Sequence, residues 1–171
     1  VVLKPTELTP LTALALADVL YEAGLPPEML SVVTGNPGTM GDSMITDPDC
    51  DLITFTGSVR VGKYIAEKAG YRRIVLELGG NDPLIVMEDA DLDWAVDVLM
   101  DGAMYNSGQC CCGIERIYVV EPLFDAFVEK AVAWVSKLKL GNPFEADTTI
   151  GPMAHKRFAE TVRGQISDAT T

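Results

Sequence analysis

The sequence predicts an α/β fold built on a parallel sheet, and two observations lead to this prediction. Over residues 1–80, short β-branched runs alternate with longer segments whose apolar residues recur at helical spacing. Strands that alternate with helices in this way form parallel sheets with helices on their faces. The composition, with 48% hydrophobic and 22% charged residues, is that of a globular protein with one ordinary core or two small ones.

The elements of the first half each have a local signal. Strands are expected at residues 1–3, 30–33, 51–56 and 74–78, where short apolar or β-branched runs lie. A helix is expected over residues 10–23, and a second, short one should follow a turn at residues 35–38 and end near Ile45. Ser58 is a suitable N-cap for a third helix over residues 59–69. The apolar face predicted for the first helix is formed by Leu11, Leu14, Leu16, Val19 and Leu20.

The second half has a different character, and a domain boundary is placed near Gly80, dividing the chain into residues 1–80 and 81–171. Strands are expected at residues 83–86 and 114–120. Helices are expected at residues 91–104, 122–138 and 155–169, and a cysteine-rich turn follows the first of them. The helix over residues 122–138 is amphipathic, with one side formed by Phe124, Phe127, Ala131 and Trp134.

Charge and cysteine usage exclude several classes of partner. The net charge is −12 and the sequence pI is about 4.3, so the surface repels phosphate backbones and no nucleic acid partner is expected. No apolar run reaches the roughly 18 residues of a membrane helix, and the chain opens without a signal peptide's basic region. The four cysteines suit neither a zinc site nor a disulfide framework. A reducing, cytoplasmic compartment, no metal and a reactive thiol are therefore expected.

A strand, a turn and a helix follow one another from Phe55 to Gly62. This arrangement places free N–H groups of a helix N-terminus beside the turn, where a pyrophosphate binds. Taken alone, the segment fits an ordinary N-cap at Ser58 better, and no G-x-G-x-x-G fingerprint is present.

Three kinds of side chain are candidates for chemistry. A thiol of the run Cys110-Cys111-Cys112 is a nucleophile if its pKa is lowered at a turn, although a single cysteine is more often a small buried hydrophobe. Glu77 ends an apolar strand, where partial desolvation raises a carboxyl pKa toward that of a general base; a solvent-facing charge is the alternative. His155, the only histidine, fits the surface start of a helix, which disfavours a cysteine protease or a Ser-His-Asp hydrolase.

Taken together, these segments resemble the aldehyde dehydrogenase superfamily. The resemblance extends through most of the chain, and the separation of Glu77 and Cys111 also resembles the family's spacing. Its segments, in the family's order, are Lys4-Pro5-Thr6-Glu7 with Thr9-Pro10, Glu22-Ala23-Gly24-Leu25-Pro26, Phe55-Thr56-Gly57-Ser58, Glu77-Leu78-Gly79-Gly80, Asp89-Ala90-Asp91-Leu92, Gly108-Gln109-Cys110-Cys111 and Gly151-Pro152.

The resemblance implies a role for particular residues. In the family's Gly-Gln-x-Cys motif the nucleophile is Cys111, and the Glu of Glu-Leu-Gly-Gly, here Glu77, is the general base. Lys4 and Glu7 correspond to residues that hold the adenosine ribose. A carboxylate at Glu7 favours NAD as the cofactor, with NADP as the alternative. The resemblance implies further cofactor-binding residues at or beside the wall that contacts the pyrophosphate and the adenine. They are Phe55, Gly57, Ser58, Val61, Gly62 and Leu78.

The resemblance also implies the reaction and the architecture. Cys111 attacks an aldehyde to give a thiohemiacetal, oxidation with NAD leaves a thioester, and water activated by Glu77 releases a carboxylic acid. Residues 1–80 would be the C-terminal part of a Rossmann-like NAD-binding domain, and residues 81–171 the N-terminal part of an α/β catalytic domain. The full-length protein would be a homo-oligomer that acts on a small-molecule aldehyde.

Family members are much longer than 171 residues. Their oxyanion-hole Asn would precede Val1, and the Glu that holds the nicotinamide ribose would follow Thr171. The chain alone is therefore expected to show little or no activity. The alternative is a non-catalytic fragment or a structural or binding protein that keeps the fold, although the presence of both Cys111 and Glu77 favours an active enzyme.

Overall fold

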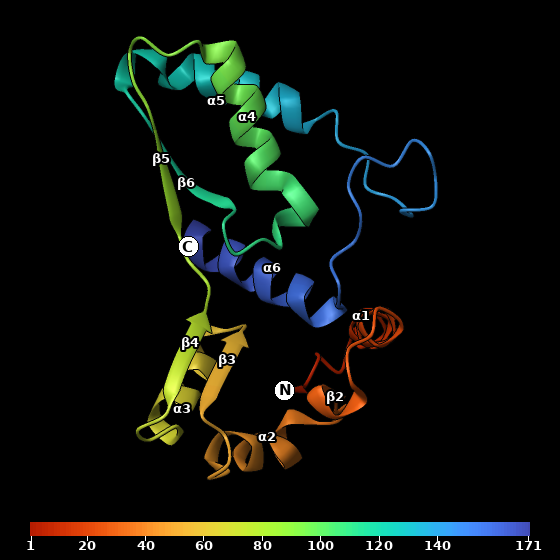
Figure 1. Ribbon diagram of the computed structural model, residues 1–171. Coiled ribbons are helices and arrows are strands. Elements are labelled where there is room, and N and C mark those ends of the chain that lie inside the picture. The colour runs from red at the N-terminus through yellow and green to blue at the C-terminus, as the bar shows by residue number, and fades with distance from the viewer. The chain divides into compact units, whose positions relative to one another are not determined.

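The computed structural model describes residues 1–171, which divide into two compact units, Val1–Leu78 and Gly79–Thr171. Each unit combines a parallel strand arrangement with helices, so the predicted α/β class is confirmed (Figure 1).

The first unit contains two parallel strand pairs. β1 (Val2–Leu3) pairs with β2 (Ser31–Val32), and β3 (Leu52–Thr56) pairs with β4 (Arg73–Glu77). Each pair is a separate two-stranded sheet, so the strands do not form the single sheet that the alternating pattern predicts. The connecting helices are α1 (Leu11–Glu22), η1 (Pro27–Met29), α2 (Pro37–Thr46) and α3 (Val59–Lys68).

Side-chain caps define where two of these helices begin. The Oδ1 atom of Asn36 accepts a hydrogen bond from the Gly38 N–H at 2.7 Å, and Pro37 occupies the first helical position. α2 therefore begins inside the segment predicted as a turn. The predicted cap of α3 is confirmed, since Ser58 Oγ accepts from the Val61 N–H at 3.3 Å.

Arg72 connects the C-terminal ends of α2 and α3. Its guanidinium group donates hydrogen bonds to the carbonyls of Thr46, Asp47, Cys50 and Ala69 at 2.8, 2.8, 2.9 and 3.0 Å. The last carbonyls of a helix have no partner within the helix, and a cation is favourable there. One side chain thus satisfies both helix ends and the loop between α2 and β3.

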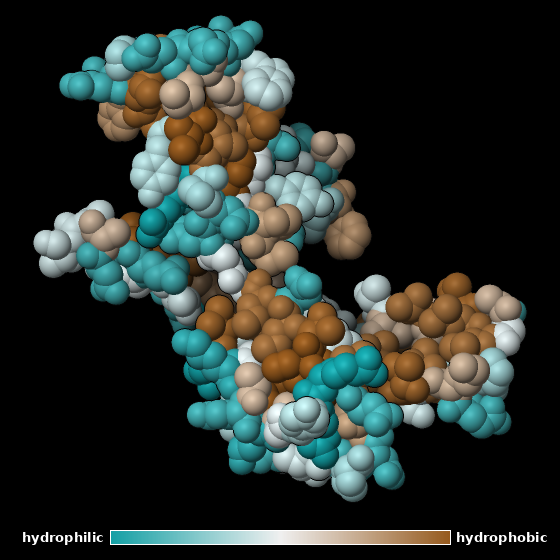
Figure 2. Space-filling model, turned by 60° about the vertical axis from the view of Figure 1, so that its left-hand side comes forward, coloured by the Kyte–Doolittle hydropathy of each residue, from teal (hydrophilic) through white to brown (hydrophobic).

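The apolar face predicted for α1 is not buried. Leu11, Leu16 and Val19 are 75%, 52% and 59% exposed, and the one buried residue of α1 is Ala17. α1 contacts β2, and no other element of its unit covers it to a comparable extent. The spacing of these apolar residues predicted the helix correctly. Their exposure shows that no other element of the unit packs against them. Apolar side chains gather in patches on the surface shown in Figure 2.

The second unit is organised around one strand pair and two helices. β5 (Asp82–Val86) lies parallel to β6 (Ile114–Val119), and α4 (Leu92–Met104) packs against α5 (Glu121–Val135). Asp91 caps α4 by accepting the Trp94 N–H at 3.1 Å. The buried core is formed by Val86, Ala95, Val96, Leu99, Met100 and Phe127.

The side of α5 that faces the core differs from the prediction at one position. Phe127 is buried, and Ala131 and Trp134 pack against the core as predicted, whereas Phe124 is 51% exposed. Leu123 packs against the core instead, because it lies four residues before Phe127, one helical turn away. Polar contacts between α4 and α5 flank the core: Trp134 Nε1 donates to Asp97 at 2.8 Å, and Lys130 pairs with Asp93.

The β5–β6 pair contains an irregularity close to the cysteines. Asp82 pairs with Ile114 and Pro83 pairs with Arg116, which leaves Glu115 as the extra residue of a bulge. The carboxylate of Glu115 accepts the Asp82 N–H at 2.7 Å.

The chain ends in α6 (Lys156–Thr170). As predicted, His155 lies exposed at its start, where the Nδ1 atom accepts the Arg157 N–H at 3.1 Å. None of the helices combines the length and the apolar character that a membrane-spanning segment requires.

Candidate functional site

The loop that precedes the cysteines has an unusual backbone. α4 passes into the short helical segment η2 (Tyr105–Gly108), in which Asn106, Ser107 and Gly108 have φ values of 50°, 59° and 74°. Left-handed backbone is disfavoured for residues with a Cβ, and such conformations concentrate at functional sites. The cysteine turn thus begins from a segment whose conformation is imposed by its surroundings.

The three adjacent cysteines lie in a tight turn. The Gly113 N–H donates to the Cys110 carbonyl at 3.2 Å, so Cys111 and Cys112 occupy the two central positions. The Cys111 side chain is exposed, and its N–H donates no hydrogen bond within the chain. Cys111 therefore presents both a thiol and a free backbone donor.

The neighbouring thiols contact each other. Cys110 Sγ and Cys112 Sγ are 3.5 Å apart. This hydrogen bond, together with the charges that would develop on Cys110 and Cys111, raises the pKa of Cys112 above its usual value. Cys112 is consequently disfavoured as a thiolate nucleophile.

The segment after β4 runs beside the cysteine turn. A Cβ atom added to Gly80 would lie 3.6 Å from the Cys111 carbonyl oxygen and 2.9 Å from Asp82 Oδ1. Glu115 holds Asp82 at the bulge described above. Gly80 thus lies within van der Waals distance of the cysteine turn.

Two residues of the loop attach it to a distant segment, a role that no sequence pattern predicts for them. Ser107 Oγ donates to the Gly151 carbonyl, and Gln109 Oε1 accepts the Ala154 N–H at 2.9 Å. The motifs around Gly108 and Gly151 were both noted in the sequence, but no local signal connects segments so far apart in the chain. The one available hint was the Asn-Ser-Gly run, since Asn and Gly tolerate positive φ.

A cavity of about 290 Å³ adjoins the same loop. Asp101, Tyr105, Trp134 and Pro152 are among the residues that line it, together with Asn106 and Ser107. The loop that carries the cysteines therefore forms part of its wall.

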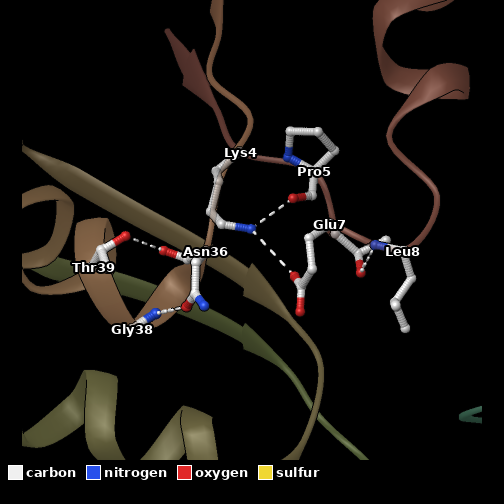
Figure 3. Close-up of polar contacts among 8 residues, drawn as sticks. Lys4, Pro5, Glu7, Leu8, Asn36, Gly38 and Thr39 are labelled. Atoms are coloured by element: carbon white, nitrogen blue, oxygen red, sulfur yellow. Dashed lines mark hydrogen bonds and ion pairs between the residues drawn. The ribbon is translucent and has the colours of Figure 1, made fainter.

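In the first unit, Lys4 and Glu7 follow the end of β1. Lys4 Nζ donates to the Pro5 carbonyl at 2.7 Å and lies 3.8 Å from Glu7 Oε2 (Figure 3). The side chain of Lys4 is 16% exposed and that of Glu7 43%. The pair lies at the carboxyl end of the β1–β2 strands, the edge where parallel sheets bind ligands. Asn36, which begins α2, appears in the same view.

The turn between β3 and α3 is tightly packed. The Gly57 N–H donates to the Glu77 carbonyl at 3.0 Å, which ties the ends of β3 and β4 together. A Cβ atom at Gly57 would lie 2.5 Å from the Phe55 ring. Ser58 is exposed at the N-terminus of α3, and the absence of a side chain at Gly57 leaves room for the Phe55 ring.

One turn into α3, Gly62 is buried against Leu78. An added Cβ atom would lie 2.5 Å from Leu78 Cδ2. Val61 is half-buried beside it. Glu77, immediately before Leu78, is exposed, so the desolvation expected for this carboxylate is not present in the chain. A strand end at a sheet edge leaves the carboxylate in water unless another segment covers it.

The predicted site residues divide between the units. Lys4, Glu7, Glu77 and the residues from Phe55 to Gly62 belong to the first unit, and Cys111 belongs to the second. No group of three or more His, Cys, Asp or Glu side chains is placed to hold a metal ion.

Comparison with known proteins gives a consistent result. A family model described as "Aldehyde dehydrogenase family" matches residues 1–171. "Aldehyde dehydrogenase 2, mitochondrial" of Saccharomyces cerevisiae is 45% identical over 172 residues, which cover 99% of this chain and 34% of that protein.

Two solved structures are also similar. An NAD-dependent aldehyde dehydrogenase from Sinorhizobium meliloti superposes with a TM-score of 0.93 and 41% identity, over 97% of this chain and 33% of that one. An NADP-dependent enzyme of E. coli gives a TM-score of 0.95 and 38% identity, over 99% of this chain and 36% of that one. The chain spans about a third of the length of the relatives it matches.

Proposed function

Because the chain belongs to the aldehyde dehydrogenase family, we propose that it is the cofactor-binding and nucleophile-bearing part of an enzyme that oxidises an aldehyde to a carboxylic acid with NAD. In this proposal, residues 1–80 are the C-terminal part of the NAD-binding domain. Residues 81–171 are the N-terminal part of the catalytic domain.

The observation that carries the proposal is the exposed Cys111 at the centre of its turn. Its thiol is accessible, whereas the contact with Cys110 raises the pKa of the Cys112 thiol. A thiolate is the reactive form of cysteine, so Cys111 is the preferred nucleophile of the two exposed cysteines. Its sulfur would attack the carbonyl carbon of the aldehyde and form a thiohemiacetal.

The same residue would stabilise the charge that this attack creates. The aldehyde oxygen becomes an oxyanion, and the N–H of Cys111, which has no partner in the chain, is available as a donor to it. Oxidation of the thiohemiacetal leaves a thioester on Cys111.

Glu77 is proposed as the base that completes the reaction. Its carboxylate would take a proton from water, and the resulting hydroxide would attack the thioester and release the acid. Glu77 is exposed in the chain, so water reaches it.

The polar groups of the first unit suit a dinucleotide. Lys4 and Glu7 offer an ammonium and a carboxylate for ribose hydroxyls, and Ser58 with the α3 N-terminus offers donors for a pyrophosphate. Phe55, Val61 and Leu78 would supply apolar contacts nearby. When bound, NAD supplies the hydride acceptor for the oxidation.

Glu7 makes NAD the preferred form of the cofactor. A carboxylate accepts hydrogen bonds from a free 2′-hydroxyl and repels a 2′-phosphate. The neighbouring Lys4, at 3.8 Å, would reduce this repulsion, which leaves NADP possible as a weaker ligand.

Two measurements on the chain test the proposal. The first is the pH dependence of iodoacetamide labelling, resolved for each cysteine by tandem mass spectrometry: Cys111 should react at a lower pH than Cys50. The second is the affinity for NAD, measured by titration calorimetry. The substitution Glu7→Gln should weaken the affinity for NAD more than the affinity for NADP. Because Cys111 is more exposed than Cys50, only the pH dependence of labelling is compared between them, not its rate. A non-catalytic protein that keeps only the fold predicts the same pH dependence for both thiols and no binding of NAD, and that result would refute the proposal.

A further inference from the structure

We propose that Gln109 is a positioning residue for Cys111: it fixes the backbone from which the cysteine turn begins and thereby determines which of the three adjacent thiols is reactive. This inference rests on the proposed function, because it takes Cys111 as the nucleophile.

Every polar group of Gln109 forms a hydrogen bond. Its N–H and its Nε2 both donate to the Asn106 carbonyl, at 3.2 and 2.9 Å. Its own carbonyl accepts from Asn106 Nδ2 at 3.1 Å, and its Oε1 accepts the Ala154 N–H at 2.9 Å. A glutamine is needed for this pattern, since only a primary amide both donates and accepts at the end of a side chain of this length.

These bonds immobilise the residue directly before the turn. Gln109 precedes Cys110, whose carbonyl closes the turn onto the Gly113 N–H, and Cys111 lies between them. The bond to Ala154 and the bond from Ser107 to Gly151 anchor the loop to the segment after β6 and α5. Reactive groups need support of this kind, because a shift of about 1 Å is enough to lose much of their activity.

The bonds are poorly explained by a need to stabilise the fold. None of the residues from Tyr105 to Cys112 belongs to the buried core of the unit, and Asn106 and Cys111 are exposed. Asn106 and Ser107 are held at positive φ, which disfavours the loop. A loop that served only to connect α4 with β6 would relax to a less costly conformation, so the network serves to place the cysteines.

The test compares the chain with its Gln109→Met and Gln109→Glu variants. Methionine keeps the length of the side chain and removes both hydrogen bonds of the amide; glutamate keeps the acceptor toward Ala154 and removes the donor toward Asn106. Labelling by iodoacetamide is followed as a function of pH at each of the three adjacent cysteines and at Cys50.

In the unsubstituted chain, Cys111 should label faster than Cys110 and Cys112. Gln109→Met should lower this preference on the order of tenfold, since each hydrogen bond lost shifts a conformational equilibrium several-fold. Gln109→Glu should retain an intermediate preference. The profile of Cys50, in the other unit, should not move.

Gln165→Met is the matched control, because Gln165 is the other glutamine, is exposed on α6 and forms no hydrogen bond through its side chain. The same loss of preference in this variant would overturn the proposal, as would an unchanged preference in both Gln109 variants while Cys111 stays the fastest thiol. If the labelling of Cys111 in the unsubstituted chain has the same pH dependence as that of Cys50, the proposed nucleophile itself is wrong, and the positioning role fails with it.

Discussion

At the scale of single residues, the neighbouring atoms determine whether a glycine can be substituted and how a cysteine thiol ionises. Gly57 and Gly62 have no room for a Cβ atom, whereas Gly164 has nothing within 4 Å of that position. Among the cysteines, Cys112 contacts the sulfur of Cys110, while Cys111 is exposed between them. Residues of the same type therefore have different chemical and packing roles, which substitution can separate.

We expect Gly62→Ala to destabilise the chain by about 1 kcal/mol, because the new methyl group overlaps Leu78 and forces it to move. Gly164→Ala, in the open part of α6, should instead stabilise that helix by roughly 0.5–1 kcal/mol through its better helix propensity. Urea-induced unfolding followed by circular dichroism measures both. Stabilisation by both substitutions would contradict the packing described for Gly62.

Cys110→Ala should lower the pKa of Cys112. The contact with Cys110 raises that pKa by favouring the neutral thiol, so its removal allows the thiolate to form at a lower pH. The labelling profile of Cys112 should therefore shift toward lower pH, while that of Cys50 stays in place. A shift in the opposite direction would show that the two sulfurs do not interact in this way.

At the scale of elements, helix ends and helix faces decide how each unit is held together. Arg72 joins the end of α2, the loop that follows it and the end of α3 through four carbonyls, and α4 and α5 enclose the core of the second unit. Both arrangements connect segments that are neighbours in space and distant in sequence.

Removal of the Arg72 guanidinium should destabilise the first unit by about 2–3 kcal/mol, since four carbonyls, two of them in partly buried hydrogen bonds, lose a charged donor. The adjacent Arg73 is exposed and donates no side-chain hydrogen bond, so Arg73→Ala is the control and should change stability by less than about 0.5 kcal/mol. The difference between the midpoints of thermal unfolding of Arg72→Ala and Arg73→Ala tests this. Equal midpoints would contradict the role assigned to Arg72.

The positions of the elements and the burial of their faces differ in how well the sequence predicted them. Strand and helix positions were predicted well, because β-branched runs, Ser58 and Asp91 act locally. The burial of helix faces was predicted less well: the face of α1 and Phe124 of α5 are exposed. Periodicity identifies residues that share a face, but whether a partner covers that face depends on contacts that no local pattern encodes.

The same reasoning applies to the candidate site. Motif order pointed to Cys111 and to the residues around Gly57, and these assignments stay predictions for experiment. The bonds from Ser107 and Gln109 to Gly151 and Ala154 were not predictable, because each joins residues more than 40 positions apart. The Glu115 bulge escaped notice for a similar reason, since register between β5 and β6 is set by both strands.

At the scale of the whole molecule, the chain covers about a third of its relatives and has a net charge of −12. The proposed reaction needs groups from both units, Cys111 and Glu77 among them. The absence of a nucleic acid partner, which the acidic composition predicts, stays a prediction. A homo-oligomeric full-length protein and a reducing, cytoplasmic environment for the four free cysteines stay predictions.

We expect the 171-residue chain by itself to oxidise aldehydes with NAD at a small fraction of the rate of a full-length relative, because the chain supplies only about a third of such an enzyme. The absorbance of NADH, recorded with the chain and with the Saccharomyces cerevisiae relative at equal concentration, provides the comparison. Rates close to those of the relative would contradict this expectation, and a signal abolished by Cys111→Ala would still identify the nucleophile.

The position of Trp134, whose indole donates a hydrogen bond to Asp97, has a practical consequence for fluorescence experiments. Both tryptophans of the chain, Trp94 and Trp134, belong to the unit that carries the cysteines. When tryptophan is excited selectively, its fluorescence therefore originates in that unit alone. Trp134 also lines the cavity beside the cysteine loop. A small molecule that enters this cavity should change the emission spectrum, so the chain contains an intrinsic optical reporter for binding beside the loop that precedes the cysteines.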